Sequence, residues 1–442
     1  MSTPMTNLQR LAVVLSIVST SAVATAQPAP PPGDPPPTET PPTETPPSDS
    51  PPSDASPAPP AVPPSDAPPA APKKADTPLL VTYDKGIAFT TADKAFKAKL
   101  NLRSQLRFDA TRPTDPGAEF QNRVLIARAR LGIDGNAFGE RNRYKLELGL
   151  GDKGSFSFVK DLFVEKALGS AWVRIGQWKR PFNRQEIVSD FAQTFTDRAN
   201  TAGYVGGGRD AGIAIHNDYE KSPAGLEWVV GVFNGFSGAG DAPSLPATCV
   251  EGATAPSCTV GSPTTVPSDW GPTVVGRVGW NSPDMKGYSE GDLEGGPLRY
   301  AVAIAYKVDL ANFAQGEAPS RAENLSHGLE ADAALKVQGF DLSVGGYLMK
   351  VKAADATYGA MAQAGYFVVP EHGQVAARFA IAPTSGTRKQ LEARVAFTWY
   401  WEGHRWKWIN ELGWVVQTGT DSKTMTSDDP DYQLRSCAQL TF

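Results

Sequence analysis

Basic side chains recur at every second position in three segments of the sequence. Such residues share a face when the backbone is extended, because successive side chains of a strand point to opposite sides. Eight basic residues would line one face in this way: Lys97, Lys99, Arg103, Arg107, Arg128, Arg130, Arg143 and Lys145. Asp109, Asp134 and Glu147 oppose them in charge. Arginine offers phosphate-like groups a rigid fork of donors and lysine offers a mobile point charge, so the pattern predicts a surface that attracts anions.

The positions between these cations are apolar, which predicts strands with one apolar and one hydrophilic face. In the first segment the apolar positions are Ala98, Leu100, Leu102, Leu106 and Phe108. In the second segment they are Leu125, Ala127, Ala129, Leu131 and Ile133. The same alternation continues at residues 144–150, 298–306, 329–337 and 391–399. Short turns and longer loops separate these segments, so we expect an antiparallel sheet.

The first 26 residues predict export from the cytoplasm. Arg10 precedes an apolar run from Leu11 to Val18, and small residues follow up to Ala26. This order is typical of a cleaved signal peptide, and its apolar run is shorter than the ~20 residues of a membrane-spanning helix. The chain has no later apolar stretch of that length, and its mean hydropathy is negative. A membrane protein built from strands stays possible, because its strands face lipid with only every second residue.

Residues 27–75 are rich in proline, alanine, serine, threonine and acids, and they contain repeats such as Pro-Pro-Thr-Glu-Thr. Such a composition cannot bury a core, so we expect a disordered, extended linker. It would lie in the periplasm, either as a passive spacer or as a tether that contacts the cell wall.

Residues 76–442 are expected to form one outer-membrane porin β-barrel. The charged face suits a wet lumen, and the aromatic residues suit a girdle at the membrane interface. These aromatic residues are Tyr306, Trp399, Tyr400, Trp401, Trp406 and Trp408. The last segment places Tyr432, Leu434, Ala438, Leu440 and Phe442 on one face, as a strand that closes a barrel in lipid would. The length suits about 16 strands, with 14 or 18 as alternatives, and a barrel of that size leaves an aqueous channel.

Catalytic and metal-binding patterns are weak. His216, His327, His372 and His404 stand singly, without metal-ligand spacing. We therefore expect no catalytic residue, no metal and no cofactor. The pair Ser326 and His327 leaves one enzymatic alternative, a lipase-like barrel enzyme of the outer membrane.

Three cysteines are too few for a disulfide framework. Cys249 and Cys258 lie in one Gly/Pro/Ser/Thr-rich segment, where they either close a small loop or stay as free thiols. Cys437 has no obvious partner.

Residues 173–186 read Val-Arg-Ile-Gly-Gln-Trp-Lys-Arg-Pro-Phe-Asn-Arg-Gln-Glu. This run resembles the strand-to-loop signature of the phosphate-selective porin O and P family, which joins Gly-Gln-aromatic-Lys to Pro-Phe and a later Glu. Residues 195–198, 208–212 and 232–235 resemble further elements of that family in the same order. The resemblance runs from Lys97 to Phe442 and departs from the signature at Asn183, where the family often has Gly.

The resemblance implies a sixteen-stranded, trimeric, anion-selective pore that an inward-folded loop narrows. The constriction residues would then be Lys179, Arg180, Arg184, Arg198 and Arg209. These cations could instead form structural ion pairs with neighbouring acids, which are Glu186, Asp197 and Asp210.

Together these patterns predict a channel for passive diffusion of small anions, phosphate-like ions among them. Its expected partners are outer-membrane lipid, anionic solutes, further copies in a homotrimer, and barrel-assembly machinery that recognises Phe442. No basic excess points to nucleic acid, because the formal net charge is −5. Acids on later strands, Glu330, Asp332, Glu392 and Glu411, leave a general or cation-preferring porin as one alternative. An envelope anchor with incidental conductance is the other.

Overall fold

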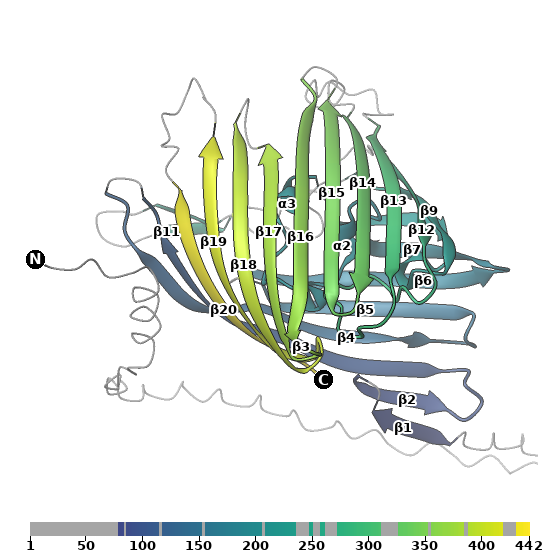
Figure 1. The fold of residues 1–442 in the computed structure, drawn as a ribbon. Helices are drawn as coiled ribbons and strands as arrows, with labels where there is room; N and C mark the ends of the chain where they lie inside the picture. The colour runs from purple at the N-terminus through teal and green to yellow at the C-terminus, as the bar shows by residue number, and fades with distance from the viewer. Residues whose placement is uncertain are drawn as a thin grey trace, which may run out of the picture. The chain divides into compact units, whose positions relative to one another are not determined.

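The computed structural model describes residues 78–83, 85–114, 117–152, 155–205, 208–235, 247–250, 257–260, 272–310, 326–351, 355–383, 388–418 and 430–442. Sixteen of the described strands pair antiparallel in chain order, and the last pairs with the first to close a barrel (Figure 1). This confirms the predicted all-β barrel of about 16 strands. The predicted signal peptide and the proline-rich linker lie outside the described residues.

The barrel strands are β3 (Lys97–Arg112), β4 (Gln121–Asn136), β5 (Asn142–Asp152), β6 (Ser155–Leu168), β7 (Ala171–Lys179), β8 (Arg209–His216), β9 (Gly225–Phe233), β12 (Thr273–Asn281), β13 (Arg299–Asp309), β14 (Ser326–Val337), β15 (Phe340–Val351), β16 (Thr357–Val369), β17 (Gly373–Pro383), β18 (Lys389–Glu402), β19 (Trp406–Thr418) and β20 (Asp431–Thr441). A hairpin of β1 (Leu79–Tyr83) and β2 (Ile87–Thr91) pairs with the start of β3.

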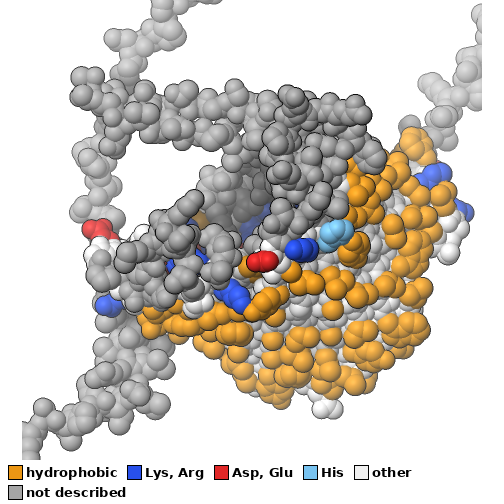
Figure 2. All heavy atoms as spheres, turned by 90° about the horizontal axis from the view of Figure 1, so that it is seen from above, with side chains coloured by type: hydrophobic (Ala, Val, Ile, Leu, Met, Phe, Trp, Pro, Cys, Tyr) orange, Lys and Arg blue, Asp and Glu red, His pale blue; other side chains and the backbone are white. Residues whose placement is uncertain are grey.

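The alternation of the sequence becomes the two faces of the barrel wall. On β20, Tyr432, Leu434 and Leu440 are exposed on the outside, whereas Gln439 is buried on the inside. On β13, Tyr300 and Ile304 point outward, and Arg299 is buried inside. Figure 2 shows hydrophobic side chains across the outer wall that this view displays. An apolar exterior and a polar interior are what a barrel in lipid requires.

The predicted inward and outward positions of β4 are wrong in the first half of the strand. A β-bulge shifts the register, because Gln105 pairs with Arg128 whereas Leu106 pairs with Ile126. Ala127 is the extra residue and is buried inside, so Val124 and Ile126 take the outward positions instead of Leu125. A bulge inserts one residue and reverses the parity of the strand on one side of it, which a regular two-residue period cannot reveal.

The predicted aromatic girdle also needs one correction. Tyr306, Trp401, Trp406 and Trp408 are exposed on the outside. Tyr400 is instead fully buried inside the barrel, where its hydroxyl donates to Gln374 Oε1 at 2.7 Å. Adjacent residues of a strand face opposite sides, so Tyr400 could not share a face with Trp401.

Connections differ between the two ends of the barrel. At the end where the chain finishes, which we call the turn end, most connections are short. Gln338 and Gly339 join β14 to β15 with φ of +50° and +86°. These angles suit a two-residue turn of type I′, for which glycine is favoured. Longer connections lie at the opposite end, which we call the loop end.

One of the longer connections, between β9 and β12, contains a separate hairpin of β10 (Ala247–Val250) and β11 (Ser257–Val260). Its backbone register places Cys249 opposite Cys258. A disulfide between them and two free thiols both stay as the alternatives that the sequence left open.

None of the helices in the described ranges is long and apolar enough to span a bilayer.

Candidate functional site: the lumen and its inner loop

The connection between β7 and β8, residues 180–208, folds into the barrel, and we call its described part the inner loop. It contains α2 (Arg184–Ile187), the 3-10 turn η2 (Asp190–Ala192) and α3 (Asn200–Val205). Phe182, Phe191 and Phe195 are buried, and they pack this loop inside the wall. Residues 180–186 of the run that carries the family resemblance therefore lie in the lumen, whereas residues 173–179 belong to strand β7 of the wall.

Side-chain caps shape the inner loop locally. Asn183 Oδ1 accepts from Glu186 N at 2.9 Å and caps α2, and Ser189 Oγ accepts from Phe191 N at the start of η2. Asparagine and serine are favoured at such positions because their short side chains satisfy free backbone donors. Asn183 has φ of −101°, so this turn does not need the conformational freedom of a glycine.

Polar contacts hold the inner loop against the strands from β14 to β19. The Arg184 guanidinium pairs with Asp332 of β14, and Arg184 N donates to Glu330 Oε1 at 3.0 Å. On β19, Glu411 Oε2 accepts from Thr196 N at 3.0 Å. Buried donors and acceptors are costly when unpaired, so these contacts fix the loop in place.

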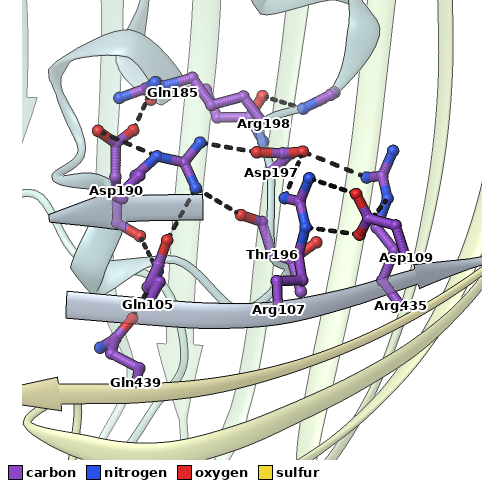
Figure 3. A network of polar contacts seen from close by, with 12 residues as sticks. Gln105, Arg107, Asp109, Gln185, Asp190, Thr196, Asp197, Arg198, Arg435 and Gln439 are labelled. Carbon is purple, nitrogen blue, oxygen red and sulfur yellow. Dashed lines mark hydrogen bonds and ion pairs between the residues drawn. The ribbon is translucent and has the colours of Figure 1, made fainter. Parts of the chain in front are cut away.

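A second set of contacts ties the inner loop to the wall formed by β3, β4 and β20. We call it the loop–wall network (Figure 3). Asp197 accepts from Arg107 Nη1 at 2.9 Å, from Arg128 Nη2 at 2.7 Å and from Arg435 Nη1 at 3.4 Å. The inner loop thus spans the lumen. On the side of β3, β4 and β20, the loop supplies the carboxylate and the wall supplies the arginines.

Asp190 is the second carboxylate of the loop–wall network. It lies 2.6 Å from Arg198 Nη1 and 3.6 Å from Arg128 Nε. Burial by itself would raise the pKa of Asp190, but Arg198, Arg128 and Lys179 outweigh burial and hold this pKa well below its ordinary value of 3.8. Asp190 is therefore a carboxylate that stays ionised in the lumen.

A turn from the opposite end of the barrel meets the inner loop. The connection between β12 and β13, residues 282–298, is long for the turn end and folds inward. Glu290 N donates to Ala192 O at 2.9 Å, and Glu290 Oε2 accepts from Thr194 N at 2.8 Å. The guanidinium of Arg184 lies 4.8 Å from the ring centroid of Tyr288. The lumen is thus narrowed from both ends.

A cavity of about 210 Å³ remains between the inner loop and the wall of β3 and β5 to β8. Its charged lining consists of Arg103, Lys145, Lys179, Arg209, Glu147, Asp161, Asp190 and Glu220. Phe163, Trp178, Ile187, Phe191 and Tyr288 form much of the rest. Four of these side chains are cations and four are carboxylates, so their formal charges cancel. The exposure of each group, rather than the number of groups, therefore decides which sign of charge a solute contacts.

Two carboxylates of this cavity, Asp161 and Glu147, are less exposed than cations that they pair with. Asp161 accepts from Lys145 Nζ at 2.6 Å and from Arg209 Nε at 2.7 Å. The Asp161 side chain is 7% exposed and that of Lys145 is 36% exposed. Glu147, at 5%, is likewise less exposed than its partner Arg103, at 17%. Glu220 is 43% exposed, but both of its oxygens accept from Arg174 at 2.9 Å. Two of the carboxylates are therefore less exposed than their cationic partners, and Glu220 is exposed but already paired with Arg174.

The thirteen cations predicted from the sequence all belong to the inner face of the wall or to the inner loop. Most of them form ion pairs: Lys99 with Asp134, Arg103, Arg130 and Arg209 with Glu147, Arg107 and Arg128 with Asp197, Arg143 with Asp218, Lys145 with Asp161, Arg180 with Asp210, Arg184 with Asp332, and Arg198 with Asp190. Lys97 and Lys179 have no carboxylate within 4.0 Å among the described residues. Lys179 Nζ donates to Val188 O at 3.0 Å.

Several residues of the lumen were not predicted. Asp161 and Glu165 face inward on β6 while Leu162 and Val164 face outward, and this alternation is visible in the sequence. Asp190 and Glu290 lie in a loop and a turn, where the sequence carries no periodic signal.

Groups that could hold a metal ion are not found among the described residues. His327, of the enzymatic alternative, lies toward the outside of β14, where its Nδ1 contacts the hydroxyl of Tyr306 at 2.5 Å.

No protein-family model matches the sequence, and no curated protein sequence matches it. Solved structures are similar in fold. The anion-selective porin from Comamonas acidovorans is 13% identical, with a TM-score of 0.48, over 78% of this chain and 99% of that one. The outer membrane channel DcaP of Acinetobacter baumannii is 11% identical, with a TM-score of 0.48, over 78% and 97%. Salmonella typhi OmpF is 12% identical, with a TM-score of 0.46, over 82% and 100%. At this level of likeness, the function has to be argued from the barrel itself.

Proposed function

We propose that this chain is an outer-membrane channel for passive diffusion of small anions, phosphate-like ions among them. The closed barrel carries apolar side chains outside and charged ones inside, and only closed barrels and helices satisfy their backbone in lipid. The inner loop and the turn of residues 282–298 leave a charged cavity of about 210 Å³ as a place for selection. A solute of this channel would pass between the inner loop and the wall.

The observation that carries the anion preference is the difference in exposure between the two signs of charge. All four side chains line the cavity, but those of Lys145 and Arg103 are 36% and 17% exposed, whereas those of Asp161 and Glu147 are 7% and 5% exposed. A partly dehydrated anion would meet N–H donors first, because the carboxylates already accept from those cations. Fixed donors of this kind can replace part of the hydration shell of an ion.

Lys179 supports the phosphate-like class within this proposal. Its ammonium donates to Val188 O and has no carboxylate within 4.0 Å among the described residues, so it keeps donors for a solute. Arg209 and Arg103, which line the same cavity, add guanidinium forks.

Bilayer conductance across a KCl gradient tests the proposal. We expect a reversal potential that shows chloride preference, followed by a decrease in chloride current when phosphate is added. Preference for potassium would instead support the general or cation-preferring porin. Chloride preference without any effect of phosphate would remove the phosphate-like class and leave the anion channel.

A further inference from the structure

The hairpin of β1 and β2 extends the barrel wall beyond the end of the chain. β20 pairs with β3 from Arg112 to Arg103, and Phe442 O accepts from Leu102 N at 2.7 Å. The next residues of β3, from Leu100 to Lys97, pair with β2. β2 therefore pairs with the same side of β3 as β20 does, directly beyond the β20 ladder, and Figure 1 shows β2 beside the start of β3 and β1 on the other side of β2.

One face of this hairpin is apolar and continuous with the outer face of the barrel. The register places Val81 opposite Phe89, Tyr83 opposite Ile87, and Ile87 opposite Leu100. Leu79, Val81, Tyr83, Ile87, Phe89 and Leu100 thus share one face, and their exposed fractions run from 36% to 63%. Outward residues of the barrel wall, such as Val164 at 57%, are exposed to the same degree.

The opposite face is different. It carries Thr82 and Thr90 together with Lys97 and Lys99 of β3, although Leu80 also lies there. The hairpin therefore keeps the inside-to-outside polarity of the wall, even though it lies beyond the barrel.

We propose that the β1–β2 hairpin lies on the bilayer surface at the turn end, with this apolar face in the lipid interface. The proposal rests on the membrane location of the barrel. Leu100 and Ala98 precede Leu102 on β3 by two and four residues, which places the hairpin rows ~7 to 13 Å beyond Leu102 along the strand. The tilt of barrel strands shortens this distance along the membrane normal. Trp406 pairs with Leu440, which pairs with Ser104 of β3, and it is exposed on the outside. Tryptophan is favoured at the membrane interface, so Trp406 indicates that the interface lies close to the level of Leu102.

A second copy of the chain is a less suitable occupant. Stable protein interfaces use roughly 20 to 30 residues from each partner, and the hairpin offers six half-exposed side chains on this face. A lipid surface requires no such shape match, and an apolar face continuous with the lipid-facing wall needs only to be covered by hydrocarbon.

Spin labels on the two faces of the hairpin test this inference. Val81→Cys and Thr82→Cys are adjacent in the sequence and point to opposite faces, so each is the control of the other. Both are made in the full chain with Cys249, Cys258 and Cys437 replaced by alanine, refolded into phosphatidylethanolamine/phosphatidylglycerol vesicles, and checked for channel conductance. Val395→Cys, 54% exposed on β18, serves as the lipid-facing reference on the barrel.

We expect the label at residue 81 to collide with oxygen several-fold more than with a water-soluble nickel chelate, as the label at residue 395 does, and the label at residue 82 to show the reverse. Nickel-dominated collisions at both hairpin sites, with residue 395 in lipid, would overturn the inference and leave the membrane barrel intact. A label at residue 81 that is shielded from both reagents would also overturn it, in favour of contact with a second copy. Nickel access at residue 395 would refute the membrane barrel as well.

Discussion

Lys179 differs from the other cations of the cavity in its partners. Arg103, Lys145 and Arg209 each approach a carboxylate, whereas Lys179 donates to the carbonyl of Val188. An ammonium has three donors, and a backbone carbonyl neutralises none of its charge. Lys179 therefore keeps hydrogen-bond donors that no carboxylate among the described residues occupies.

We predict that Lys179→Met weakens the block of chloride current by phosphate about ten-fold, because a hydrogen bond to a charged group contributes ~1.5 to 3 kcal/mol. Lys99→Met is the matched control, since Lys99 pairs with Asp134 at 3.5 Å and does not line the cavity. Titration of single channels with phosphate measures both variants. Equal block in the two variants would show that the anion binds elsewhere in the lumen.

Ion pairs with the barrel wall hold the inner loop on both of its sides. Asp190 and Asp197 face arginines of the wall, and Arg184 faces Asp332 of β14. Because the pKa of Asp190 is depressed, its contribution to stability is fully present above pH 3.8. That contribution is lost as the pH falls through the pKa of the folded state, which lies well below 3.8.

We predict that Asp190→Asn lowers the unfolding temperature of the detergent-solubilised barrel at pH 7, because Arg198 and Arg128 lose a carboxylate in a buried site. Wild-type stability should hold from pH 7 to about pH 4 and decrease below it, and the variant should decrease less over the acid range. Circular dichroism melts between pH 2 and pH 7 measure the difference. Parallel curves of melting temperature against pH for the two proteins would contradict an ionised Asp190 that stabilises the barrel.

The turn of residues 282–298 leads to a second prediction for an element. Glu290→Ala removes the acceptor of Thr194 N and should loosen the contact between this turn and the inner loop. We expect a higher and noisier single-channel conductance. Glu294→Ala is the control, because its half-exposed side chain pairs with Lys286 and Arg299 outside that contact. A conductance of Glu290→Ala equal to that of the control would mean that the turn does not limit the pore.

The whole molecule depends on closure between its first and last barrel strands. Phe442 N donates to Leu102 O at 2.9 Å, Leu102 N donates back at 2.7 Å, and the Phe442 ring is exposed on the outside. The two strands of this ladder, β3 and β20, are more than three hundred residues apart in the sequence. Contacts of such separation are costly in loop-closure entropy.

We predict that deletion of Phe442 reduces the folded fraction several-fold in cells and changes refolding into vesicles much less, because assembly machinery would recognise this residue. Tyr432→Ala, on the same face of β20, is the control. Heat-dependent migration in gels reports the folded fraction. An equal loss in cells and in vesicles would assign Phe442 to closure of the barrel alone.

Sequence by itself determined the strands and their two faces, because the direction of a side chain on a strand follows from a local two-residue period. The outward Leu440 and inward Gln439 of β20 and the wet face of β3 follow from that period. The same logic could have identified Asp161 on β6. It failed at Ala127, where a bulge breaks the period. At Tyr400 the period holds, because this residue faces the side opposite to Trp401, and the error was to group it with the girdle.

Tertiary structure decided which charges meet. Asp197 contacts Arg107 and Arg128, and Glu290 contacts the inner loop, only because the barrel closes around that loop. The cations predicted as a positive wall are therefore paired with acids from distant segments, and the exposed surface of the cavity depends on which partner lies in front. Pairings of this kind have no period in the sequence, since they arise from side chains that converge in a shared interior.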